Sequence, residues 1–127
     1  MKELLDDDVA DGVVPAAQRA ELAAAAALLG ALGDGSRLMI VQHLSLGEHR
    51  VVDLVGHLGL AQSTVSKHLA CLLECGLVTV RPEGRASVYA LAHPAATLDL
   101  LAAAEDLLGL TGNAVRLCPH VAREVER

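Results

Sequence analysis

Apolar residues recur every three or four positions along most of the chain, a spacing typical of amphipathic α-helices. Glycine-rich or polar breaks divide this pattern into five predicted helices, at 16–32, 37–46, 51–58, 62–76 and about 95–110. Asp34 or Ser36 can cap the second helix, and Pro94 suits the first turn of the last. Two β-prone runs, 77–81 and 86–91, surround a turn at 82–85 and predict a β-hairpin.

The predicted helix at 62–76 has three distinct faces, because successive helical residues turn by about 100°. Its apolar face, which we expect to be buried, carries Val65, Leu69, Leu72 and Leu73. The opposite face carries Ser63, Lys67 and Glu74. The flank between them carries Thr64, His68, Cys71 and Cys75. One helix thus combines a surface that can anchor a fold with polar groups and thiols beside it.

The order of elements from residue 51 onward is that of a winged helix-turn-helix. A short helix, a tight turn containing Gly59 and a longer helix with a polar first half form the helix-turn-helix, and the hairpin after it is the wing. We therefore predict a mainly α fold with a β-hairpin wing. The side chains expected to contact double-stranded DNA are Gln62, Ser63, Thr64, Ser66, Lys67 and His68 on the helix and Arg81 and Arg85 on the wing. The alternative interpretation is a solvated helix face without a ligand.

Length and composition fit one small domain. The chain has 127 residues, is 53% hydrophobic and contains no Trp, no Phe and one Tyr, so its core must be built from small aliphatic side chains. Such a modest core makes burial against a second copy plausible. We expect a flexible acidic tail at 1–15, the winged domain at 16–110 and a C-terminal tail at 111–127. Neither a long apolar run nor a signal-peptide pattern occurs, so we expect a cytoplasmic protein without a membrane span.

The net charge of −6 at pH 7 opposes DNA binding, but the acidic residues are unevenly distributed. They concentrate in residues 1–36, whereas residues 37–93 are slightly basic and hold most of the histidines. This balance gives weak support for phosphate binding, which a dimer would strengthen by presenting the basic patch twice.

The three cysteines are the strongest candidates for chemistry. Their odd number, in a chain expected in a reducing compartment, favours metal ligands or reactive thiols over a disulfide framework. Cys71 and Cys75 lie four residues apart on one helix, which brings their Cβ atoms to roughly 5–6 Å. Thiolates favour thiophilic ions such as Cd(II) and Pb(II), and Zn(II) with less selectivity. The alternative is that both are small core residues. A disulfide between them fits the required geometry poorly.

Four sequence blocks resemble the ArsR/SmtB family of metal-sensing repressors. They are LGDGSR at 32–37, DLVGHLGLAQSTVSKHL at 53–69, GLV at 76–78 and EGRASVYAL at 83–91. The resemblance covers about residues 20–110, and the blocks follow in the family's order and spacing. One departure is Gly35, where the family usually has Pro. We expect this change to alter the start of a helix and not the fold.

Within the family, HLACLLECGLV at 68–78 resembles the CmtR branch of cadmium and lead sensors. This likeness implies that Cys71 and Cys75 bind a metal ion together with Cys118 from the C-terminal tail. No fourth protein ligand is obvious, and His68, His120 or water could serve. It also implies a homodimer formed through the first and last helices. The metal-free dimer would bind operator DNA, and binding of Cd(II) or Pb(II), or of Zn(II) as the less selective alternative, would release it.

Other functions remain open at this point. A thiol redox switch would pair Cys118 with Cys71 or Cys75 on oxidation, and a metal buffer with this fold would have no DNA role. An enzyme is least favoured, because no catalytic constellation and no phosphate-binding glycine loop is found. The remaining histidines have no ligand spacing, so we expect surface or capping roles for His43, His49, His57 and His93.

Overall fold

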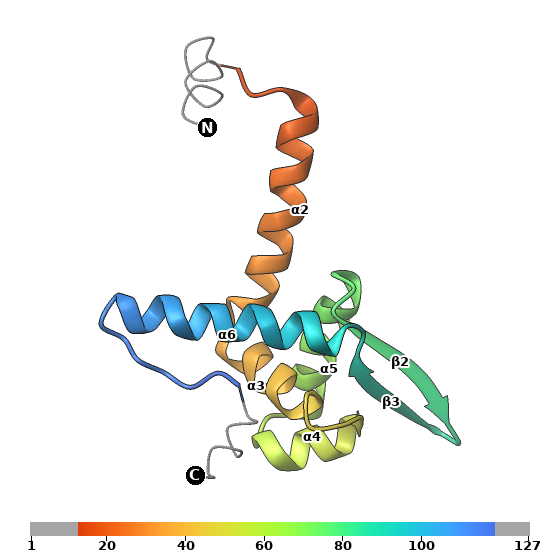
Figure 1. The fold of residues 1–127 in the computed structure, drawn as a ribbon. Helices are drawn as coiled ribbons and strands as arrows, with labels where there is room; N and C mark the ends of the chain where they lie inside the picture. The colour runs from red at the N-terminus through yellow and green to blue at the C-terminus, as the bar shows by residue number, and fades with distance from the viewer. Residues whose placement is uncertain (1–12, 119–127) are drawn as a thin grey trace.

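The computed structural model describes residues 13–118, and within them the chain forms a winged helix-turn-helix (Figure 1). Its elements, in chain order, are α2 (Ala16–Leu32), α3 (Gly35–Leu44), β1 (His49–Arg50), α4 (Val51–Leu58), α5 (Gln62–Glu74), β2 (Val78–Glu83), β3 (Ala86–Leu91) and α6 (Pro94–Leu110). The predicted mainly α fold with a hairpin wing is confirmed. Most of the predicted acidic tail, and the chain beyond Cys118, lie outside the described residues.

Helices α2 and α4 have the bounds that the sequence predicts, whereas α3 begins two residues earlier, at Gly35. The reason is a side-chain cap, since Asp34 Oδ2 accepts a hydrogen bond from the Arg37 N–H at 3.0 Å. This bond lowers the pKa of the Asp34 carboxyl below its ordinary value. The stabilisation by this cap is therefore present at neutral pH and is lost as the pH falls through that lowered pKa.

The helix that follows the turn at Gly59 folds with the predicted faces. In α5, Val65, Leu69 and Leu72 are fully buried and pack with Ile40, Val41 and Leu54 of α3 and α4 in one core cluster. Leu73 is half-buried. The opposite face, with Ser63, Lys67 and Glu74, is exposed, and the flank with Thr64, His68, Cys71 and Cys75 is half-buried. The helix ends at Glu74, two residues before the predicted end, because Gly76 has a φ of 76° that leaves the helical region.

The wing is part of a three-stranded antiparallel sheet in the order β1-β3-β2. The sequence did not predict β1, which is only two residues long and is defined by its pairing with β3. The predicted turn at 82–85 was too long, because β2 continues to Glu83 and only Gly84 and Arg85 form the loop. Pro82 is tolerated inside β2 because this strand lies at the edge of the sheet.

Two long helices leave apolar side chains outside the core. In Figure 1, α2 projects away from the body formed by α3, α4 and α5, and α6 lies across that body. Only Ala31 and Leu32, at the end of α2, are buried. Leu22 and Leu29 of α2 are 57% and 58% exposed, and Leu107 and Leu110 of α6 are 62% and 85% exposed. Apolar surface of this extent is typical of a contact with another molecule.

No single helix among residues 13–118 is long and apolar enough to cross a bilayer. Helices α2 and α3 reach that length and composition only when taken together across an 83° bend.

We expect Leu69→Ala to lower the free energy of unfolding by about 2–5 kcal/mol, because the truncation leaves a cavity where α5 packs on the core. Urea unfolding at one fixed protein concentration measures the change. Ser63→Ala, on the exposed face of the same helix, is the control and should change stability by less than about 0.5 kcal/mol. Equal effects of the two substitutions would contradict the orientation of α5.

Candidate nucleic-acid interface and cysteine site

The first two turns of α5 present a polar surface to solvent. Gln62, Ser63, Ser66 and Lys67 are exposed, and Thr64 is half-buried beside them. The helix begins after Ala61, which offers no side-chain cap to the first backbone N–H groups. A helix start with exposed hydroxyl, amide and ammonium groups can donate hydrogen bonds to phosphates and base edges. Four of the predicted DNA-contacting residues thus share one open surface.

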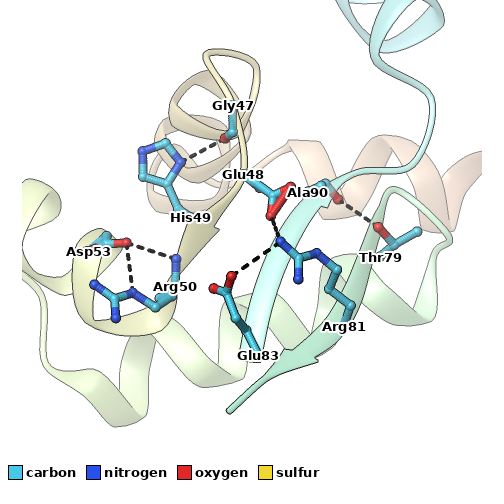
Figure 2. Close-up of polar contacts among 9 residues, drawn as sticks. All are labelled: Gly47, Glu48, His49, Arg50, Asp53, Thr79, Arg81, Glu83 and Ala90. Carbon is cyan, nitrogen blue, oxygen red and sulfur yellow. Dashed lines mark hydrogen bonds and ion pairs between the residues drawn. The ribbon is translucent and has the colours of Figure 1, made fainter. Parts of the chain in front are cut away.

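A groove of about 310 Å³ lies between the starts of α4 and α5 and the wing. It is lined by Arg50, Val51, Val52, Gln62, Arg85, Ala86 and Ser87. Arg50 was missed by the sequence analysis, because only the fold brings this residue beside Gln62 and Arg85. Asp53 Oδ2 accepts a hydrogen bond from the Arg50 N–H at 3.1 Å and lies 3.5 Å from its Nε (Figure 2). That backbone hydrogen bond is the main cause of the lowered pKa of Asp53.

The two arginines of the wing have different surroundings. The Arg81 guanidinium contacts the carboxylates of Glu48 and Glu83 (Figure 2). Arg85 is exposed in the loop between β2 and β3 and forms no ion pair within the described part of the chain. Arg85 can therefore contact a phosphate directly, whereas Arg81 would first have to leave its acidic partners.

His68 faces into the protein and not toward the open surface of α5. Its side chain is 17% exposed, with Nδ1 3.2 Å from Arg37 Nη1 and Nε2 3.9 Å from Asp34 Oδ2. Since a guanidinium can only donate, we assign Nδ1 as the acceptor, which puts the proton of the neutral ring on Nε2, toward Asp34. In this conformation His68 connects α5 to the start of α3. It was predicted as a DNA contact and as one choice of fourth metal ligand, and either role would require the ring to leave these contacts.

Cys71 and Cys75 lie on the half-buried flank of α5 as free thiols. The Cys75 Sγ donates a weak hydrogen bond to the Ala27 carbonyl of α2 at 3.6 Å. Beside it, a groove of about 460 Å³ is lined by Ala24, Ala27, Leu28, Glu74 and Cys75. The pair is thus not sealed in the core, and the groove gives a ligand access to Cys75.

Cys118, by contrast, is buried in the core of the same chain. It is 2% exposed, and its Sγ lies 3.8 Å from the Leu98 carbonyl of α6. The segment after α6 turns back along the body toward α3 (Figure 1). The Glu105 carboxylate accepts hydrogen bonds from the N–H groups of Leu117 and of Cys118, the latter at 2.6 Å. Gln42 Nε2 of α3 donates to the Leu117 carbonyl at 2.8 Å.

The structure therefore brings two of the three predicted metal ligands together and leaves the third elsewhere. Within residues 13–118, no three His, Cys, Asp or Glu side chains are positioned to hold a metal ion. His120, the other choice of fourth ligand, lies outside the described residues. Binding of one ion by all three thiols would require movement of the tail that carries Cys118.

Comparison with known proteins places these features in context. The family model for bacterial regulatory proteins of the arsR family matches residues 34–80. A probable mercury resistance operon repressor of Streptomyces lividans is 34% identical over 97 residues, which are 76% of this chain and 77% of that protein. The regulator CmtR of Mycobacterium tuberculosis is 48% identical over 62 residues, which are 49% of this chain and 52% of that protein.

Two solved structures are informative. The NMR structure of the M. tuberculosis cadmium sensor CmtR matches with a TM-score of 0.52 and 44% identity, covering 59% of this chain and 78% of that one. A homodimeric winged helix-turn-helix DNA-binding domain of Mycobacterium bovis matches with a TM-score of 0.66 and 30% identity, covering 73% of this chain and 88% of that one.

We expect Arg85→Ala to weaken binding to promoter DNA more than Arg81→Ala, because the Arg81 charge is already neutralised by Glu48 and Glu83. Loss of one phosphate contact should also reduce the slope of log affinity against log salt by about one per chain. Fluorescence anisotropy at several salt concentrations measures both effects. A larger loss for Arg81→Ala would contradict this assignment of the wing.

Proposed function

Since this chain belongs to the arsR family of bacterial regulatory proteins, we propose that it is a cytoplasmic repressor that binds operator DNA without metal and leaves it when Cys71, Cys75 and Cys118 bind a thiophilic metal ion. The chain is a winged helix-turn-helix regulator and not an enzyme. The observation that carries the proposal is the position of two thiols on the flank of α5, the helix whose other side presents the polar surface.

The DNA half of the proposal is supported by the surface around the start of α5. Gln62, Ser63, Ser66 and Lys67 would enter the major groove, and Arg50 and Arg85 would contact phosphates at its edges. The overall charge of −6 makes electrostatic attraction weak for a single chain. Specific contacts, doubled in a dimer, must therefore supply most of the affinity.

The dimer is supported by the apolar side chains that α2 and α6 leave exposed, such as Leu22 and Leu110. In a homodimer these helices would pack on their counterparts and remove this surface from water. A related domain is described as homodimeric. Two-fold symmetry would present two copies of α5 to successive major grooves, which suits a palindromic operator.

The metal half is supported by donor chemistry and by relatives whose names refer to mercury and cadmium. Thiolates suit Cd(II) and Pb(II) best, and Zn(II) is the less selective alternative. When bound, the ion would supply positive charge that offsets the charge of the thiolates. Cys71 and Cys75 fit such a group, because they are adjacent on the flank of α5 and partly accessible.

The stored position of Cys118 supplies a mechanism for the switch. In the described conformation Glu105 and Gln42 hold the tail against α6 and α3, and the Cys118 thiol is buried. For Cys118 to join the other two thiols, these hydrogen bonds must break and the tail must move to the flank of α5. A tail attached there would restrict the adjustment of α5 to the DNA groove. By linkage, operator DNA would weaken metal binding by the same factor.

We expect Cys71→Ser to leave DNA affinity unchanged and to abolish release by Cd(II), because the helical thiol pair would be lost. Anisotropy of labelled promoter DNA, with and without Cd(II), measures both quantities. Cd(II) titration of the unmodified chain should also give an ultraviolet thiolate-to-metal absorption band that weakens in Cys118→Ser. Normal release of Cys71→Ser by Cd(II) would refute the assignment.

Treatment of the unmodified chain with peroxide distinguishes the redox switch from the metal sensor. A thiol switch would release DNA on treatment with peroxide and would leave a disulfide between Cys118 and Cys71 or Cys75, detectable by mass. The metal-sensor proposal predicts no such release by peroxide. Disulfide formation coupled to release, without an effect of Cd(II), would replace the metal sensor with the redox repressor.

We expect Glu105→Ala to expose Cys118, because it removes the acceptor of two backbone hydrogen bonds. A hydrogen bond to a charged group contributes about 1.5–3 kcal/mol, so alkylation of Cys118 should accelerate about tenfold or more. The rate is measured in a Cys71→Ser, Cys75→Ser background, where Cys118 is the remaining thiol. Asp106→Asn, at the neighbouring exposed position of α6, is the matched control. Equal rates in both variants would show that Glu105 does not hold the tail.

A further inference from the structure

Three histidines that the sequence separates lie together beside the helix-turn-helix. His43 comes from the last turn of α3, His49 from β1 and His57 from the last turn of α4. Their ring centroids are 5.2 Å apart for His43 and His57, 5.5 Å for His49 and His57, and 6.3 Å for His43 and His49. The sequence predicted separate surface or capping roles for these histidines. It did not predict that they lie together, because their spacing along the chain does not reveal the cluster.

Two of these rings are held in the tautomer that leaves the outer nitrogen free to bind a metal. His43 Nδ1 lies 2.9 Å from the Met39 carbonyl oxygen, and His49 Nδ1 lies 2.8 Å from the Gly47 carbonyl oxygen (Figure 2). A carbonyl oxygen can only accept, so each neutral ring carries its proton on Nδ1 and keeps a lone pair on Nε2. Metal-binding histidines commonly use this arrangement, in which a backbone carbonyl orients the ring through its other nitrogen.

The separations of the rings also suit a shared ion. Metal–nitrogen bonds of about 2.0–2.1 Å put each ring centre roughly 3.2 Å from the ion, so centres would be about 5 Å apart at tetrahedral angles and about 6 Å apart at wider ones. The observed separations span this range. In the described side-chain conformations no three such groups are positioned to hold an ion. Rotation of the exposed His57 ring is therefore required, whereas His43 and His49 keep the carbonyl hydrogen bonds that orient them.

We propose that His43, His49 and His57 form a second metal site, which binds a divalent ion that prefers imidazole, such as Zn(II), Ni(II) or Cu(II). Three neutral imidazoles differ in softness and charge from the three thiolates, so the two sites rank metal ions differently. The bound ion would connect α4 to α3 and β1 and so hold the first helix of the helix-turn-helix.

The test uses the Cys71→Ser, Cys75→Ser, Cys118→Ser variant, which removes every thiol. Calorimetry with Zn(II) at pH 7.5 should give one equivalent per chain, and His57→Gln should lower that affinity at least tenfold. His93→Gln is the matched control, because His93 is also exposed but lies before α6, outside the cluster. Unchanged Zn(II) binding in His57→Gln, or an equal loss in His93→Gln, would overturn the proposal.

A second measurement does not require the thiol-free variant to fold. The unmodified chain is first saturated with Cd(II), and paramagnetic Ni(II) is then added while the histidine ring signals are followed by NMR. Selective broadening of the His43, His49 and His57 signals supports the site, whereas uniform broadening that includes His93, or none, contradicts it. Neither measurement involves DNA, and the calorimetry uses a chain without thiols, so failure of the repressor proposal would not affect the calorimetric result.

Discussion

The packing of the apolar face of α5 onto α3 and α4 is the constraint on which the functional surfaces depend. Val65, Leu69 and Leu72 are fully buried against residues such as Ile40 and Leu54, which fixes the rotation of the helix about its axis. With that rotation fixed, the polar first turns face solvent and both thiols lie on the flank. A rotation by one residue position, about 100°, would bury a polar group and separate the thiols from their groove. Core packing and the two candidate functions are therefore set by the same three side chains.

The thiols on α5 and the thiol in the tail are kept apart by a small number of polar contacts. Glu105 is the central one, because a single carboxylate oxygen accepts hydrogen bonds from two successive backbone N–H groups. Different faces of α6 therefore make different contacts. One face exposes Leu107 and Leu110 to solvent, and another packs against Cys118. Movement of the tail would therefore alter contacts of the same helix through which we propose that subunits associate.

Local pattern predicted much of this molecule and failed where contacts between distant segments decide the outcome. The three faces of α5, the bounds of α2 and α4 and the hairpin follow from periodicity, because burial in a helix repeats with its own turn. Strand β1 exists only through pairing with β3, so no property of His49 and Arg50 alone could predict it. The length of β2 was underestimated because Pro82 was assigned to the turn, although proline is tolerated in a strand at the edge of a sheet.

In the candidate site, too, local spacing predicts some features and contacts between distant segments determine the others. The adjacency of Cys71 and Cys75 follows from their spacing, whereas the burial of Cys118 depends on Glu105, which lies thirteen residues away in the chain. The inward orientation of His68 likewise depends on Arg37 and Asp34, from a turn more than thirty residues earlier. The groove beside Arg50 collects residues from β1, α4, α5 and β3, and the histidine cluster collects residues from α3, β1 and α4. Such convergence is a property of the fold.

The exposure of α2 has a consequence for how much of this protein is functional in a cell. Most helical stability in proteins comes from tertiary packing, and only the last two residues of α2 are buried against the rest of the chain. In the proposed dimer the rest of α2 would gain its packing from the partner subunit, so dilution would destabilise the helix as well as separate the subunits. The concentration of the chain in the cell would then act as a threshold. Below it α2 would stay unfolded, and a weakly transcribed gene would yield little of the proposed dimer.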